Sequence, residues 1–135
     1  MSRVLVDSNV LLDVFTEDEN WFDWSREALE RCAEDSIVCI NPVIYAEVSV
    51  RFERVEEMES ALPPDLVERL AIPYEAAFLA GKCFLDYRRR GGKRSAPLPD
   101  FFIGAHAAVE DMTLLTRDMG RYRTYFPGLK LICPD

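Results

Sequence analysis

The segment RVLVDSN, residues 3–9, decides how the rest of the chain is interpreted. An apolar run, residues 4–6, is followed at once by Asp7, Ser8 and Asn9. A short β-branched run that ends in turn-forming residues is typical of a buried strand that stops at the edge of a sheet. The segment therefore predicts a strand with a carboxylate at its carboxyl end. It leaves open whether Asp7 only caps the helix that follows.

Similar apolar runs recur along the chain and alternate with helical stretches. We expect strands at residues 3–6, 36–40, 68–72, 113–116 and 129–133, and helices at residues 10–15, 21–34, 41–60, 74–90 and from Asp100 to 112. Strands that are apolar throughout are buried on both faces, as in a parallel sheet covered by helices. The pattern therefore predicts a three-layer α/β/α fold with a parallel sheet and right-handed crossovers.

Length and composition indicate a single globular domain, residues 1–135, of which 49% are hydrophobic. No apolar stretch approaches the roughly 20 residues that cross a bilayer, and the N-terminus has no secretion-type segment. The four cysteines have no C-x-x-C spacing, and only one histidine is present to join them in a zinc site. We therefore expect reduced cysteines in a soluble cytoplasmic protein.

The net charge of −8 is distributed unevenly. Residues 1–68 contain 17 acids and 5 bases, a net of −12, whereas residues 69–135 contain 7 acids and 11 bases, a net of +4. The basic excess peaks in RRRGGKR, which contains Arg88, Arg89, Arg90, Lys93 and Arg94. Such a loop either contacts a phosphate backbone or is only a solvated run of charge.

Four acids from separate segments are expected at one edge of the sheet. Asp7 and Asp118 follow strands, while Glu47 and Asp100 lie near the starts of helices that run back along the sheet. The carboxyl ends of the strands are where such folds bind ligands. Each acid also has an ordinary interpretation: Asp100 as an N-cap, Asp118 as a turn residue and Glu47 as an edge position on its helix.

Carboxylates that crowd together either gain protons or bind a cation. No basic residue is obviously placed beside all four acids. Oxygen ligands suit Mg²⁺ or Mn²⁺ better than zinc, and Asn9 and Thr116 add neutral oxygens near the same edge. His106 is a weak candidate for chemistry, because six residues along a helix turn it away from Asp100. Gly104, on the face of Asp100, either leaves room for substrate or serves helix packing.

Five motifs resemble the PIN-domain ribonucleases, and within them the VapC-like toxins of bacterial type II toxin–antitoxin pairs. They are DSNVLLD (residues 7–13), NPVIYAE (41–47), LPDFFIGAHA (98–107), LLTRD (114–118) and RYRTYFP (121–127). The resemblance implies strand order 3-2-1-4-5 and Mg²⁺-dependent endonucleolytic cleavage of RNA. It also implies that Asp7, Glu47, Asp100 and Asp118 are the catalytic metal-binding acids, that Asn9 and Thr116 support them, and that the protein forms a homodimer and binds an antitoxin.

Other functions compete with the nuclease. A haloacid dehalogenase-type phosphatase needs a second aspartate where this chain has Asn9, and it needs a lysine near the late acids, which this sequence does not offer. A receiver domain needs a lysine opposite its phosphorylated aspartate. A non-catalytic module whose acids attract a basic partner remains an alternative. For the antitoxin, residues 10–15 and the stretch Trp21, Phe22 and Trp24 are expected to form an apolar groove, unless these rings only pack against the sheet.

Overall fold

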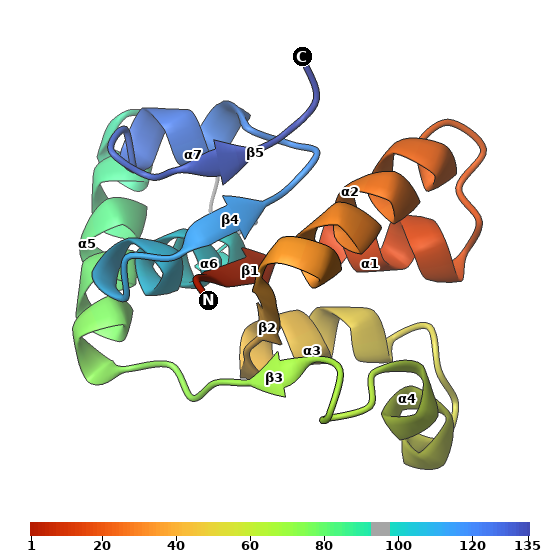
Figure 1. The fold of residues 1–135 in the computed structure, drawn as a ribbon. Helices are drawn as coiled ribbons and strands as arrows, with labels where there is room; N and C mark the ends of the chain where they lie inside the picture. Colours follow the sequence, from red (N-terminus) through yellow and green to blue (C-terminus); the bar gives the residue numbers. More distant parts are fainter. Residues whose placement is uncertain (93–97) are drawn as a thin grey trace.

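The computed structural model describes residues 1–92 and 98–135 and contains a five-stranded sheet (Figure 1). The strands are β1 (Arg3–Val6), β2 (Ile37–Ile40), β3 (Glu68–Arg69), β4 (Thr113–Leu115) and β5 (Leu131–Ile132). All neighbouring strands are parallel, and their order is β3-β2-β1-β4-β5. The predicted α/β fold and strand order are therefore confirmed, with β1 in the centre.

Helices lie to both sides of the sheet, with α1 and α2 at one side in Figure 1 and α5 at the other. The helices are α1 (Ser8–Phe15), α2 (Phe22–Asp35), α3 (Pro42–Ser49), α4 (Val55–Ala61), α5 (Tyr74–Arg89), α6 (Leu98–Val109) and α7 (Gly120–Tyr125). The core contains all three apolar residues of β1 and the fully buried ring of Phe101 in α6. A side chain at Gly104 would lie 2.5 Å from the Phe126 ring, so this glycine serves helix packing.

Several boundaries differ from those expected. β3 ends at Arg69 rather than at residue 72, and α6 ends at Val109 rather than at residue 112. Two helices differ further. The helix expected at 41–60 is interrupted after Ser49, and α4 begins only at Val55. In the connection Phe52 packs edge-on against Phe15, with ring centroids 5.7 Å apart, and this tertiary contact competes with a continuous helix. The expectation of one helix was therefore wrong.

The helix expected to start at Asp100 starts earlier. α6 begins at Leu98 and includes Pro99, so that Asp100 is its third residue. Proline is tolerated in the first turn of a helix because no intrahelical hydrogen bond is lost there. The interpretation of Asp100 as an N-cap, which assumed the later start, is wrong.

The sequence predicts reduced cysteines and no membrane-spanning segment. All four cysteines are free, with Cys32 and Cys39 buried in the core and Cys83 and Cys133 partly exposed. Among residues 1–92 and 98–135, no helix has the length and apolar character needed to cross a bilayer.

Candidate active site

Asp7 lies at the carboxyl end of β1 with only 3% of its surface exposed. It occupies the N-cap position of α1, but its side chain accepts no hydrogen bond from a backbone N–H of that helix. Instead its Oδ2 accepts hydrogen bonds from Thr116 Oγ1 at 2.9 Å, Tyr122 OH at 2.9 Å and Asn9 Nδ2 at 3.4 Å. The capping interpretation is wrong, and this buried carboxylate contacts only neutral donors.

Glu47 approaches the same edge from α3. Its Oε1 accepts a 2.8 Å hydrogen bond from Ser8 Oγ, the residue after Asp7. The start of α3 is fixed by two residues: Asn41 Oδ1 accepts a hydrogen bond from Ile44 N at 2.9 Å, and Pro42 occupies the first turn. These contacts place Glu47 next to the end of β1.

His106 supports α3 rather than the acids. Asn41 Oδ1 is occupied by the helix cap, so Asn41 Nδ2 donates to His106 Nδ1 at 3.0 Å. Burial lowers the pKa of His106, which favours the neutral ring that this hydrogen bond requires. The expectation that His106 faces away from Asp100 agrees with this contact.

Asp100 and Asp118 complete the acidic edge from two further elements. Asp100 Oδ2 accepts a 2.7 Å bond from Arg121 Nη1, so a cation contacts one of the four acids. Asp118 is exposed in the loop after β4, and its backbone N donates to Thr116 Oγ1 at 3.1 Å. Thr116 therefore connects this loop to Asp7.

The electrostatics show that the acids lie close enough to repel one another. Burial, together with the charges of Asp100 and Glu47, raises the pKa of Asp7 to about 6, although hydrogen bonds from Thr116 and Tyr122 lower it. Burial and the charge of Asp100 also raise the pKa of Glu47. The pKa of Asp100 is raised by burial and by Asp118 in spite of Arg121. Burial is the largest cause of the raised pKa at all three acids, and at each of them the charge of a neighbouring acid adds to it.

The donor chemistry of these acids fits a hard divalent cation. In each of Asp7, Glu47 and Asp100, one carboxylate oxygen accepts a short hydrogen bond. The second oxygen of Glu47 and of Asp100 accepts no hydrogen bond from the described residues, and that of Asp7 accepts only a long one, from Ser8 at 3.5 Å. Within that part of the chain, no three His, Cys, Asp or Glu side chains are close enough to bind one ion together. Mg²⁺ typically uses one or two carboxylates and keeps several waters, which suits this arrangement.

Arg121 and Tyr122 are the site residues that the sequence reasoning missed. They are adjacent on α7, and they contact two different acids, Asp100 and Asp7. The segment RYRTYFP contributed only to the resemblance, because neither the position nor the direction of so short a helix follows from its pattern. The aromatic and basic residues just after Asp118 were the available signal.

A second buried aspartate lies near the first. Asp13 of α1 is also 3% exposed, and its Oδ2 accepts 2.7 Å hydrogen bonds from Ser25 Oγ and from Arg117 Nε. The Arg117 guanidinium lies 5.4 Å from the centre of the Trp21 ring. Asp13 therefore joins α1, α2 and the loop after β4.

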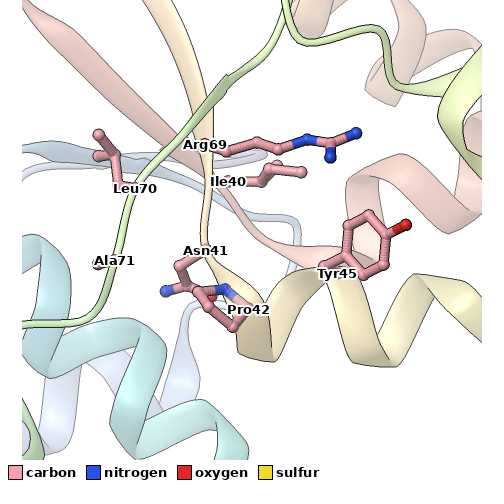
Figure 2. A pocket seen from close by; sticks show the side chains of 7 residues that line it. All are labelled: Ile40, Asn41, Pro42, Tyr45, Arg69, Leu70 and Ala71. Carbon is pink, nitrogen blue, oxygen red and sulfur yellow. The ribbon is translucent and has the colours of Figure 1, made fainter.

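A cavity of about 390 Å³ lies at the carboxyl ends of β2 and β3, the edge of the sheet at which Asp7 ends β1 (Figure 2). Arg69 and Tyr45 stand at one side of it, and Leu70 and Ala71 at the other. Arg69 is occupied by Glu59, which it contacts at 2.8 Å. None of the four acids lines this cavity.

The basic loop is described only in part. Arg88 and Arg89 end α5 and are exposed, while Arg90 pairs with Asp86 at 3.1 Å. Lys93 and Arg94 lie outside the described residues.

The aromatic residues proposed for a groove are all partly buried. Trp21 and Trp24 meet edge to face with ring centroids 6.2 Å apart, and Trp24 packs against the core. The Arg26 guanidinium lies over the Phe22 ring, with its central carbon 5.8 Å from the ring centre. At least Trp24 therefore has the packing role that was the alternative to a groove.

Comparison with known proteins assigns the class. The PIN domain family matches residues 4–127, so this chain belongs to that family, whose members are nucleases. The match decides against the phosphatase and receiver alternatives. No curated protein matches the chain significantly by sequence.

Solved structures with the same fold include toxin–antitoxin proteins. VapBC2 from Rickettsia felis has a chain of 19% identity and TM-score 0.74, with 98% of this chain and 99% of that one covered. A chain of VapBC-1 from nontypeable Haemophilus influenzae has 16% identity and TM-score 0.72, with 97% of each chain covered. A chain of FitAcB from Neisseria gonorrhoeae has 17% identity and TM-score 0.70, with 96% of each chain covered. At these identities the likeness concerns the fold.

Proposed function

We propose that this protein is a Mg²⁺-dependent endoribonuclease, with Mn²⁺ as a substitute ion, that acts in the cytoplasm as the toxin of a toxin–antitoxin pair. The observation that carries the proposal is Asp7, a buried carboxylate whose pKa is raised by burial and by neighbouring acids and whose contacts are all neutral. A purely structural aspartate is normally neutralised by a cation, whereas here the neighbours are further acids. PIN domain membership gives the nuclease class, and the VapBC and FitAcB structures supply the toxin–antitoxin context.

The proposed mechanism assigns a role to each acid. Asp7 and Asp100 would bind the metal ion, and Glu47 and Asp118 would complete its shell directly or through water. Such an ion, when bound, lowers the pKa of a water molecule and stabilises negative charge on a phosphate. Asp118 or Glu47 accepts the proton of the attacking water. Thr116, Asn9 and Tyr122 hold the Asp7 carboxylate in one orientation by donating to a single oxygen.

Replacing Asp100 tests the site directly. Asp100→Ala is expected to abolish Mg²⁺-dependent RNA cleavage while circular dichroism and the thermal melt remain close to wild type. The loss of repulsion between Asp100 and its neighbouring acids offsets the loss of its ion pair with Arg121, which is about one third exposed. Glu75→Ala, an exposed acid in the first turn of α5, is the matched control and should cleave normally. A collapsed fold in Asp100→Ala would show a structural role instead. Retained cleavage would contradict its assignment as a ligand.

We also propose that a cognate antitoxin binds at the acidic edge and inserts a basic side chain among the acids. A forked guanidinium matches two carboxylates, and the net charge of −12 on residues 1–68 favours a basic partner. Val10 and Leu11 are buried in the core, so the apolar contacts would come from the partly exposed Leu12, Val14 and Phe15 of α1 and from Trp21. Co-expression with the neighbouring small gene tests this: a copurified pair that keeps full ribonuclease activity at saturating Mg²⁺ would refute it.

The remaining proposals concern RNA contact and assembly. The basic loop is proposed to contact RNA phosphates through Arg88, Arg89, Arg90, Lys93 and Arg94. Neutralising these residues should then reduce the slope of log K against log salt for RNA binding. An unchanged slope would show that the loop is only a solvated surface. The homodimer proposed from the family is checked by sedimentation of the purified toxin.

A further inference from the structure

Two arginines border the acidic edge in closely similar surroundings. Arg117 donates through Nε to Asp13, and Arg121 donates through Nη1 to Asp100, both at 2.7 Å. Their guanidinium carbons lie 5.4 Å and 5.5 Å from the ring centres of Trp21 and Tyr87. Each side chain is about one third exposed, at 31% and 32%. Both are therefore held in place and still reach solvent.

Each guanidinium keeps N–H groups for another ligand. In the described residues, Arg117 donates from its side chain only through Nε, and Arg121 only through Nη1. Arg69 shows the contrast: it also lies over a ring, that of Tyr45, but both of its terminal nitrogens bond Glu59 and one also bonds the Leu62 carbonyl. Arg69 thus donates three side-chain hydrogen bonds within the protein, whereas Arg117 and Arg121 each donate one to the described residues.

The two arginines approach the acids from different sides. The backbone N of Arg117 donates to Asn9 Oδ1 at 3.4 Å, and its side chain is anchored to α1 by Asp13, next to Trp21 before α2. Arg121 is anchored to α6 by Asp100 and lies over Tyr87 of α5. Figure 1 shows α1 and α2 at one side of the sheet and α5 at the other. Arg117 thus belongs with the helices at one side of the sheet and Arg121 with those at the other, while Asp7 ends the central strand β1.

We propose that these two arginine–aromatic pairs are two nucleotide subsites, one on each side of the scissile phosphate. This inference rests on the proposed nuclease function and names how its single-stranded substrate is bound. A polyanion that approaches four acids needs fixed positive charge, and a planar guanidinium with free N–H groups suits a phosphate. Trp21 is partly exposed and offers a ring on which a base stacks without sequence preference. The Tyr87 ring packs against Phe84 and Phe101, and its role is to hold the Arg121 guanidinium in place. The Arg117 subsite comprises Arg117 and Trp21; the Arg121 subsite comprises Arg121 and Tyr87.

The test measures binding of a fluorescein-labelled single-stranded RNA by anisotropy in EDTA, over a range of salt. Because Arg117→Gln alone would leave Asp13 unpaired, the variant combines Asp13→Asn, Arg117→Gln and Arg121→Gln. Each lost phosphate contact lowers the slope of log K against log salt by about 0.7, so the slope should fall by about 1.4. Arg31→Gln, Arg123→Gln and Asp23→Asn, three exposed residues on α2 and α7, change the net charge by the same amount and should leave the slope unchanged.

Three results would overturn the proposal: an unchanged slope in a variant with a normal thermal melt, an equal fall in the control, or no RNA binding by wild type at low salt. Should the triple variant unfold, Arg121→Gln alone must still lower the slope by about 0.7. A second readout uses Trp24→Phe, which leaves Trp21 as the only tryptophan. RNA should quench its fluorescence, and no quenching would remove Trp21 from the subsite. Wild-type cleavage with Mg²⁺ is measured separately, so failure of the nuclease proposal is distinguished from failure of the subsites.

Discussion

Asp7 and Asp13 are equally buried, yet the protein treats them differently. Both are 3% exposed and both belong to the start of the chain around α1. Asp13 has a cation and a hydroxyl as partners, Arg117 and Ser25, each at 2.7 Å. Asp7 has neutral donors only, and further acids raise its pKa. Burial alone therefore does not distinguish a functional carboxylate from a structural one; the balance of charge around it does.

The largest effect is expected at Asp7. Asp7→Asn preserves the shape of the side chain and an oxygen for Thr116 and Tyr122, but it removes the charge proposed to bind metal. RNA cleavage should fall by about 1,000-fold or more, while the thermal melt in EDTA stays at or above that of wild type. Substantial residual cleavage, or a lower melting temperature, would make Asp7 resemble Asp13 and break the comparison.

The next effect concerns pH. The pKa of Asp7 is raised from 3.8 to about 6, so the folded protein keeps this proton where the unfolded chain has lost it. Its contribution to the free energy of unfolding is fully present below pH 4 and is lost as pH rises to 6, a fall of about 3 kcal/mol. Urea unfolding of wild type and Asp7→Asn in EDTA, at pH 4 to 7, isolates this contribution. A constant difference between the two proteins would contradict it.

Asp13→Asn is expected to have the opposite effect to Asp7→Asn: a loss of stability with little loss of cleavage. The substitution leaves Arg117 without its carboxylate, but the guanidinium is one third exposed and can be hydrated, so the loss is about 2 kcal/mol rather than that of a fully buried pair. Urea denaturation measures the loss. Cleavage at 20 °C should fall by less than about tenfold, since Asp13 contacts none of the four acids. A stable but inactive variant would show that Asp13 acts in the site itself.

Tyr122→Phe gives the smallest effect and sharpens the comparison. It removes one of the hydroxyls that donate to Asp7 Oδ2, and should lower the free energy of unfolding at pH 7 by about 1 kcal/mol. The pKa of Asp7 should rise further, so the pH at which stability falls moves upward. Tyr125→Phe, on the same helix, has no hydrogen bond to the acids and serves as the control. Equal pH profiles in the two variants would refute the role of Tyr122.

The sequence predicts the sheet better than the connections. Apolar runs at residues 4–6 and 38–40 have few alternatives to buried strands, and the resemblance correctly implied strand order 3-2-1-4-5. The interruption between α3 and α4 was missed because it depends on Phe52 meeting Phe15, a contact between segments 37 residues apart in the chain. Local propensity carries no information about such contacts.

The same limit applies to the site. The placement of the acids at strand ends and helix starts follows from topology, and the structure brings them near one another. The pairing of Arg121 with Asp100 depends on the direction of α7, a helix of 6 residues without a clear periodic pattern. The anchoring of Arg117 likewise depends on Asp13, whose burial the sequence pattern did not reveal.

The hydrogen bonds of Asp7 also determine when during synthesis the site can exist. Thr116 and Tyr122, which donate the two shortest hydrogen bonds to Asp7, follow it in the sequence by 109 and 115 residues. A growing chain on the ribosome therefore has no ordered acidic site until its last strands and α7 have emerged and folded. In terms of sequence separation, the acidic site is thus among the last parts of the described fold that can form during synthesis.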